Sequence, residues 1–188
     1  VTLELGGMNP AVIDDTADLK DAAEKILWAK GMNSAQTCVS VNELYVHESV
    51  KDKLVEAFKK ADKKLYPKGY ILGESMAALV NNRHYSSVKG KVTEALEKGA
   101  NVVFGGDMDD TQRWISPTII TDVPAECRLR NEEIFAPVTV LTVYTDEDQL
   151  ISEIQEKPIP LAAYIFSKNR KNQKKFLARI QAGTACVN

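Results

Sequence analysis

Hydrophobic and polar positions follow two alternating patterns along the chain. Short apolar runs typical of buried strands are followed by segments whose apolar residues recur every three or four positions, as in amphipathic helices. Strands are predicted at residues 1–5, 10–13, 44–46, 101–106, 115–121, 138–144, 161–166 and 184–188. Helices are predicted at 18–31, 50–65, 81–98 and 169–181, and a further helix begins at Asp146. The segment 32–40 is predicted to be a loop.

This alternation indicates an α/β domain. Since strands and helices follow one another with no repeat and no Ser/Gly-rich linker, we expect one domain over residues 1–188. The expected architecture has three layers, α/β/α, with a mostly parallel sheet covered by helices on both faces. The chain begins and ends on strand-like runs without an initiator Met or signal peptide, so we expect it to be a segment of a longer protein.

Composition excludes several classes of protein. With 44% hydrophobic and 27% charged residues, the chain is not of the disordered type. Its 24 basic and 26 acidic residues give no field that would attract nucleic acid, and no apolar run reaches the roughly 20 residues of a membrane segment. Three cysteines lie far apart without a CxxC pair, which favours free thiols, a reducing compartment and a cytoplasmic location.

Cys38 is the candidate nucleophile. It lies in the polar loop 33–38, between the end of a helix and the start of a strand, where a thiolate can be exposed and activated by nearby dipoles. The alternative is a small buried hydrophobe, the commonest role of a lone cysteine.

Two acidic segments are further candidates. Glu4 lies in the apolar run 3–7, and burial there would raise its pKa towards that of a general base; alternatively it is the solvent-facing residue of an alternating strand. The following Gly6-Gly7 pair indicates a turn or a close backbone approach. In the segment 132–137, the two acids Glu132 and Glu133 can accept hydrogen bonds from sugar hydroxyls and Phe135 can pack on a flat ring, or the segment is an ordinary helix or turn terminus.

The remaining cysteine, histidine and basic residues suggest no second site. We expect Cys127 to be an exposed or half-buried thiol, Cys186 to be part of the core, and His84 to have a structural role. No metal site is expected, because the cysteines and histidines lack ligand-pair spacing. The basic segment 168–179 could bind RNA or a membrane surface, but it is better explained as the solvated face of a helix whose buried side is Phe176, Leu177 and Ile180.

Three segments together resemble the catalytic domain of the NAD(P)-dependent aldehyde dehydrogenase superfamily. They are Leu3-Glu4-Leu5-Gly6-Gly7, the loop Asn33 to Cys38, and Glu132 to Pro137, with Glu4 and Cys38 34 residues apart. Similarity extends to residues 81–85, 105–106, 115–119 and 160–167, and so over essentially the whole chain. Details at 36–39 and 160–167 are most similar to the class 3-like branch.

The resemblance implies oxidation of an aldehyde to a carboxylic acid through a cysteine thioester. Cys38 would attack the carbonyl and supply one oxyanion donor from its backbone N–H, and Glu4 would activate the hydrolytic water. Glu133 would hold the ribose of NAD or NADP, Phe135 would lie near the nicotinamide, and Gly6 would line the cofactor site. Family members carry a separate cofactor-binding domain and an oligomerisation hairpin and are usually homo-oligomers; we expect both of these parts to lie outside residues 1–188.

The sequence departs from the family pattern at three positions. Met8 replaces a usual Lys, and Ala35 and Ala136 replace usual glycines. A positive φ at Ala35 would cost on the order of 1 kcal/mol and could displace Cys38. Cys38, Glu4 and Glu133 are nevertheless retained, which favours an active parent enzyme; the alternative function is a catalytically silent folding or interaction domain of the same family.

Overall fold

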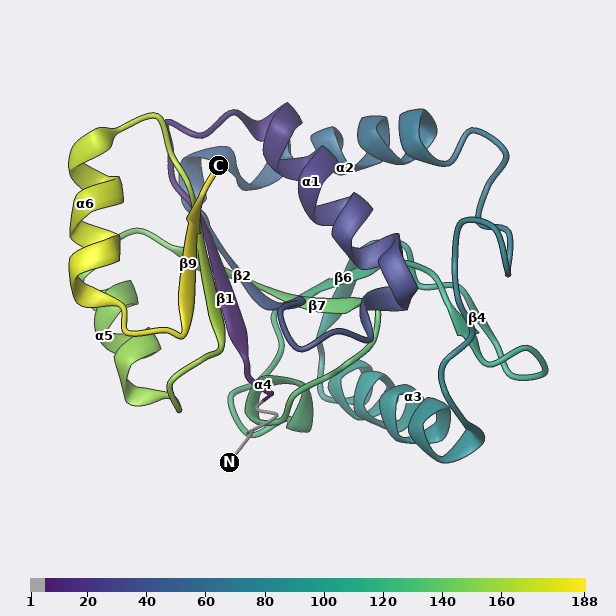
Figure 1. Ribbon diagram of the computed structural model, residues 1–188. Helices are drawn as coiled ribbons and strands as arrows, with labels where there is room; N and C mark the ends of the chain where they lie inside the picture. The colour runs from purple at the N-terminus through teal and green to yellow at the C-terminus, as the bar shows by residue number, and fades with distance from the viewer. Residues whose placement is uncertain (1–5) are drawn as a thin grey trace, which may run out of the picture.

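A seven-stranded sheet forms the centre of the protein in a computed structural model, which describes residues 6–188 (Figure 1). The strand predicted for residues 1–5, with Glu4, lies outside the described residues. The strands are β1 (Asn9–Ile13), β2 (Val41–His47), β3 (Asn101–Phe104), β4 (Met108–Asp109), β5 (Trp114–Ile115), β6 (Thr118–Thr121), β7 (Val138–Tyr144), β8 (Ala162–Phe166) and β9 (Thr184–Val187). The helices are α1 (Leu19–Gly31), α2 (Lys51–Leu65), α3 (Asn82–Glu97), α4 (Arg128–Asn131), α5 (Glu147–Glu156) and α6 (Arg170–Arg179), with 3-10 turns η1 (Met32–Ala35) and η2 (Glu48–Val50).

The sheet has the order β3-β6-β7-β2-β1-β8-β9, and every neighbouring pair except β3 and β6 is parallel. Side chains alternate between its faces: Ala11 and Ile13 pack with α1 and α2, whereas Val12 packs with α5 and α6. Helix α3 packs with β6 and β7 in a third apolar cluster. The predicted three-layer α/β/α architecture with a mostly parallel sheet is confirmed.

Polar caps fix where the helices begin. The side chains of Asp18, Asn81 and Asp146 each accept a hydrogen bond from a backbone N–H in the first turn of the helix that follows. The helix starts predicted at these three residues are therefore confirmed to within one position.

One predicted strand is in fact two. Residues 115–121 divide into β5, which pairs with β4 in a separate two-stranded sheet, and β6, which joins the main sheet. Pro117 lies between them and has no N–H to donate to a sheet ladder. The prediction of one continuous strand was wrong for this reason.

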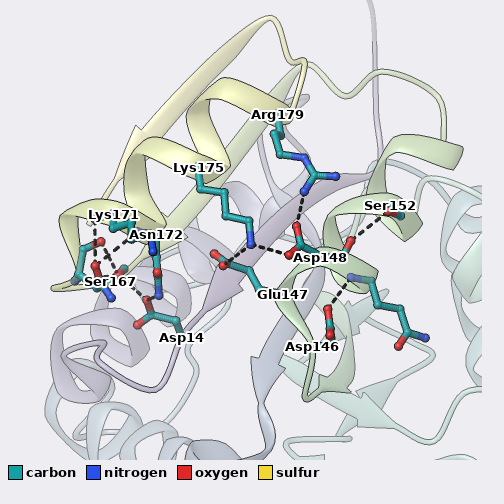
Figure 2. Close-up of polar contacts among 12 residues, drawn as sticks. Asp14, Asp146, Glu147, Asp148, Ser152, Ser167, Lys171, Asn172, Lys175 and Arg179 are labelled. Carbon is teal, nitrogen blue, oxygen red and sulfur yellow. Dashed lines mark hydrogen bonds and ion pairs between the residues drawn. The ribbon is translucent and has the colours of Figure 1, made fainter.

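The basic face of α6 is paired with acidic residues of α5 (Figure 2). Lys175 Nζ lies 2.9 Å from Glu147 Oε2 and 3.0 Å from Asp148 Oδ2, and Arg179 also pairs with Asp148. These contacts support the interpretation as an amphipathic helix. The prediction that Leu177 is buried was wrong: its side chain is 46% exposed, because one residue in a helix turns the side chain by about 100° from the buried Phe176.

Two of the cysteine environments differ from those expected. Cys127 is fully buried. It lies directly before the first residue of α4, in the apolar cluster that contains residues of α3 together with Leu129 and Ile134. Cys186 is exposed rather than in the core, because β9 is the edge strand of the sheet. Burial raises the pKa of the Cys127 thiol.

Candidate functional site

The candidate residues gather at the amino ends of the parallel strands. Gly6 and Gly7 precede β1, the Cys38 loop precedes β2, and Glu133 and Phe135 precede β7. Because these three strands are neighbours and run in the same direction, the segments before them meet at one edge of the sheet. The structure thus brings together four of the five site residues that the sequence predicts; the fifth, Glu4, lies outside the described residues.

Cys38 is half-buried in a turn whose backbone is held by Asn9. The Asn9 Nδ2 donates to the carbonyl oxygens of Cys38 (2.7 Å) and Ser40 (2.9 Å), and its Oδ1 accepts from the N–H of Ala162 at 2.8 Å. Asn9 is itself fully buried, so its side chain ties the loop to the starts of β1 and β8. No motif marks Asn9; the one signal in the sequence is a polar residue directly before a buried apolar strand.

The turn before Cys38 is left-handed. Asn33, Ser34 and Ala35 have φ angles of 51°, 49° and 55°, and Ala35 is fully buried. Such angles cost an L-residue about 1–2 kcal/mol each, with Asn tolerating them best. The positive φ considered for Ala35 from the sequence is therefore present.

Replacing Ala35 with glycine is expected to raise the free energy of unfolding by about 0.5–1 kcal/mol, because glycine adopts positive φ without a Cβ penalty but loses more chain entropy on folding. Urea denaturation of Ala35→Gly beside the parent chain measures the difference. The control is Ala125→Gly, at an exposed position outside the left-handed residues, which should not stabilise the protein. An unfolding free energy for Ala35→Gly equal to or below that of the parent would show that Ala35 is not strained.

Glu133 lies against the glycine pair. Its Oε1 accepts a hydrogen bond from the N–H of Gly7 at 3.2 Å, and a Cβ built on Gly6 would lie only 2.2 Å from its Oε2. Gly6 therefore has to lack a side chain for Glu133 to occupy this position. The contact explains why a glycine and a carboxylate 127 positions apart in sequence belong to one site.

Helix α3 supports the Glu133–Phe135 segment from the other side. The His84 Nε2 lies 2.8 Å from the carbonyl oxygen of Phe135, and the Lys91 Nζ donates to the carbonyl of Glu133 at 3.1 Å and pairs with Glu132 at 2.9 Å. Phe135 has a φ of 51° and is partly exposed, so these bonds hold a strained backbone in place. His84 thus has the structural role expected from the sequence, and that role is to hold the backbone of Phe135, a candidate site residue. No pattern in the sequence predicted the role of Lys91.

A buried lysine lies beneath the site. Lys30, in the last turn of α1, donates to the carbonyl of Val138 at 3.1 Å, and burial lowers its pKa to about 7. Together with Ser40 and Asn42 it lines a small cavity that also touches Gly7 and Glu133. The sequence marks Lys30 only as the basic end of a helix, so its burial was not foreseen.

An apolar groove of about 290 Å³ lies beside the cysteine loop. Thr37 and Val39, the residues on either side of Cys38, line it, and the Tyr164 hydroxyl donates to the carbonyl of Val39 at 2.6 Å. The apolar part of the lining is Ile26, Trp28, Ala29, Met32, Val39, Val41 and Phe166. Trp28, Met32 and Val39 are each at least 40% exposed, so the groove presents apolar surface to incoming molecules.

Over residues 6–188, no cluster of three or more His, Cys, Asp or Glu side chains is arranged to hold a metal ion. In the same range, none of the helices is both long enough and apolar enough to cross a membrane.

Comparisons with known proteins identify the family of the chain. The sequence profile of the "Aldehyde dehydrogenase family" matches residues 1–188. The chain is 37% identical over its whole length to the "Aldehyde dehydrogenase, dimeric NADP-preferring" of Canis lupus familiaris, covering 40% of it, and 35% identical to "Aldehyde dehydrogenase family 3 comG" of Dictyostelium discoideum, covering 39%. The chain therefore spans about 40% of the length of these relatives.

Solved structures give the same result. The "Substrate bound state of Staphylococcus Aureus AldH" superimposes with a TM-score of 0.90 at 34% identity, over 99% of this chain and 40% of that one. A betaine aldehyde dehydrogenase of Staphylococcus aureus, solved in complex with NAD+, superimposes with a TM-score of 0.85 at 27% identity, over 98% and 38%. The fold, the family profile and these relatives together show that the chain belongs to the aldehyde dehydrogenase family.

Proposed function

We propose that this chain is the cysteine-bearing catalytic domain of an NAD(P)-dependent aldehyde dehydrogenase, with Cys38 as the nucleophile. The observation that carries the proposal is the meeting of the Cys38 loop, the Gly6-Gly7 turn and Glu133 at one edge of the sheet. These groups belong to three segments that are distant in sequence. A site of this type requires a nucleophile and a cofactor-binding group within reach of the same substrate carbon.

Cys38 attacks the aldehyde carbonyl carbon, and its backbone N–H donates to the oxygen that becomes negatively charged. NAD or NADP, which Glu133, Phe135 and Gly6 would help to hold, would supply the hydride acceptor for that carbon, so that a thioester remains on the Cys38 sulfur. Glu4 then removes a proton from the water that attacks the thioester; the carbon–sulfur bond breaks, the carboxylic acid leaves, and the proton held by Glu4 restores the thiol.

Glu133, Phe135 and Gly6 fit the part of the cofactor nearest the reaction. Within residues 6–188 the Glu133 carboxylate accepts one hydrogen bond, from Gly7, so its other lone pairs are free to accept from ribose hydroxyls. Phe135 presents a partly exposed ring beside it, suited to packing on a flat heterocycle. Because Gly6 has no side chain, the Glu133 carboxylate can occupy the space beside it.

The apolar groove beside Thr37 and Val39 points to an aldehyde with an apolar tail. Its lining has the predominantly apolar character of small-molecule sites, and burying such a tail contributes roughly 25 cal/mol per Å². The carbonyl end of the substrate would lie at Cys38 and the tail along Met32 and Trp28.

We further propose that catalysis by the whole enzyme uses a cofactor-binding domain and an oligomerisation hairpin from outside residues 1–188. The relatives' greater length supports this, and the name of the canine relative, "dimeric NADP-preferring", supports a homo-oligomer and NADP as one of the two cofactors. The three free thiols favour a cytoplasmic location.

A catalytically silent domain is the second candidate function. The observation favouring it is the strained, buried Ala35 three residues before the nucleophile, together with Met8 and Ala136 at the two other positions that depart from the family pattern. In that case Cys38 would have no reactivity beyond that of any equally exposed thiol.

Alkylation by iodoacetamide at neutral pH distinguishes the two candidates, read by mass spectrometry of the three cysteine peptides. We expect Cys38, as the proposed nucleophile, to be labelled faster than the exposed Cys186, and the buried Cys127 to be labelled last. Slower labelling in Glu4→Gln would show that Glu4 acts on the thiol. Labelling in simple order of exposure, with Cys186 first, would support the silent domain.

A further inference from the structure

The left-handed turn before Cys38 needs an external support. Asn33, Ser34 and Ala35 all have positive φ, whereas L-residues usually adopt this conformation singly. Three in succession cost several kcal/mol in an isolated chain, so a surrounding structure must impose them.

The segment 77–80, which leads into α3, supplies that support through two side chains of the turn. The Ser34 hydroxyl donates to the carbonyl of Ala77 at 2.6 Å and accepts from the N–H of the same residue at 3.0 Å. Ser34 is 1% exposed, so both bonds are shielded from water. They fix the middle residue of the left-handed turn.

Gln36 holds the end of the turn with its whole amide group. The Nε2 donates to the carbonyls of Asn33 (3.1 Å) and Ala78 (3.2 Å), and the Oε1 accepts from the N–H of Val80 at 2.9 Å. One side chain thus joins both ends of the turn to the neighbouring segment. Cys38 follows two residues later.

We infer that Ser34 and Gln36 are positioning residues for Cys38, which hold its backbone N–H in place by bracing the left-handed turn against residues 77–80. The inference rests on the proposed function of Cys38. Neither side chain touches the reacting atoms; each acts through the backbone. The same brace leads into α3, whose His84 and Lys91 hold the Glu133–Phe135 segment, so one structural unit supports both halves of the site.

Two reactions at Cys38 separate positioning from exposure. Alkylation by iodoacetamide requires an accessible thiolate, whereas acylation by p-nitrophenyl acetate also requires the N–H that stabilises the tetrahedral oxyanion. In acylation the sulfur bonds to the ester carbonyl carbon, the carbon–oxygen bond breaks, and p-nitrophenolate leaves. The ratio of the two rates therefore reports the position of the Cys38 backbone.

We expect Gln36→Ala to lower the acylation rate of Cys38 on the order of tenfold, the equivalent of about one lost hydrogen bond, while alkylation changes little. Gln36→Glu, which keeps the acceptor for Val80, should retain part of the rate. Gln112→Ala, at an exposed position between β4 and β5, is the matched control and should leave both rates unchanged. Labelling of the buried Cys127 reports whether each variant remains folded.

Ser34→Gly provides a second test, because glycine accepts the positive φ and the fold should persist while the bonds to Ala77 are lost. A fall in the acylation-to-alkylation ratio in either folded variant supports the inference. An unchanged ratio in both, with the parent Cys38 still more reactive than Cys186, overturns the inference alone. A parent Cys38 no more reactive than Cys186 overturns the proposed nucleophile and the inference with it.

Discussion

Lys157→Met is expected to lower the free energy of unfolding by about 3–5 kcal/mol, because it leaves a buried carboxylate without its counter-charge. Glu43, on β2, is 1% exposed, and both of its carboxylate oxygens accept from the Lys157 Nζ, at 2.5 and 2.6 Å. The Tyr45 hydroxyl donates to the same carboxylate at 2.8 Å. Burial is the larger cause, and the charge of Glu43 the second, of a raised pKa at Tyr45. The group is thus a hydrogen-bonded network in the core.

Chemical denaturation at neutral pH measures this change, and two variants make the interpretation specific. Lys168→Met breaks the exposed pair with Asp18 and should cost less than about 1 kcal/mol. Combining Lys157→Met with Glu43→Gln removes both charges and should recover part of the loss. If Lys157→Met lowers the free energy of unfolding no more than Lys168→Met does, the ion pair between Lys157 and Glu43 does not stabilise the buried carboxylate.

The pair also has a consequence for the site. Lys157 follows α5 and begins the loop that leads to Pro160 and Leu161, whose backbone lies within 3.3 Å of a Cβ built on Gly7. Releasing Lys157 should therefore loosen the glycine turn that contacts Glu133.

The stability of the protein should rise by about 2 kcal/mol between pH 7 and pH 9 through Lys30 alone. Burial lowers the pKa of Lys30 from 10.5 to about 7, so in this range the unfolded chain binds a proton that the folded chain does not. By linkage, stability then increases as pH rises and levels off once the unfolded lysine also loses its proton near pH 10.5. Below pH 7 both states are protonated, and the cost of burying the charge is present in full.

Urea denaturation of the parent chain and Lys30→Met across pH 7–9 isolates this effect. The free energy of unfolding of the parent minus that of the variant should increase with pH, because the variant lacks the titrating lysine. Other groups, such as the Cys127 thiol, contribute equally to both proteins. Lys174→Met, at an exposed position, should follow the parent at every pH. A pH-independent difference between the parent and Lys30→Met would mean that Lys30 keeps an ordinary pKa in the fold.

Local signals determined how much of the fold could be predicted. Asp18, Asn81 and Asp146 cap helices through bonds to N–H groups within three residues, so the sequence alone locates those helix starts. The single strand expected at 115–121 was wrong because Pro117 interrupts it, and its two halves pair with different strands, β5 with β4 and β6 with β3 and β7.

The site shows the same division. Motifs marked Cys38 and Glu133 as candidate site residues, but gave no sign of the residues that hold them. Asn9, Lys30 and Lys91 act through bonds to backbone carbonyls 29 to 108 positions away in sequence, which no local pattern encodes. The burial of Cys127 and the exposure of Cys186 likewise depend on where α3 and the sheet edge lie.

Cys38 is proposed to be a nucleophile whose surroundings suit acyl chemistry. The most direct test is to incubate the chain with p-nitrophenyl acetate at neutral pH and to locate the acetyl group by peptide mass spectrometry, with Cys38→Ser as control. We expect a hydroxylamine-sensitive acetyl thioester that forms on Cys38 before Cys186 and is absent from position 38 in the variant. Acetylation that appears first on the exposed Cys186, with Cys38 reacting no faster, would contradict the proposed role of Cys38.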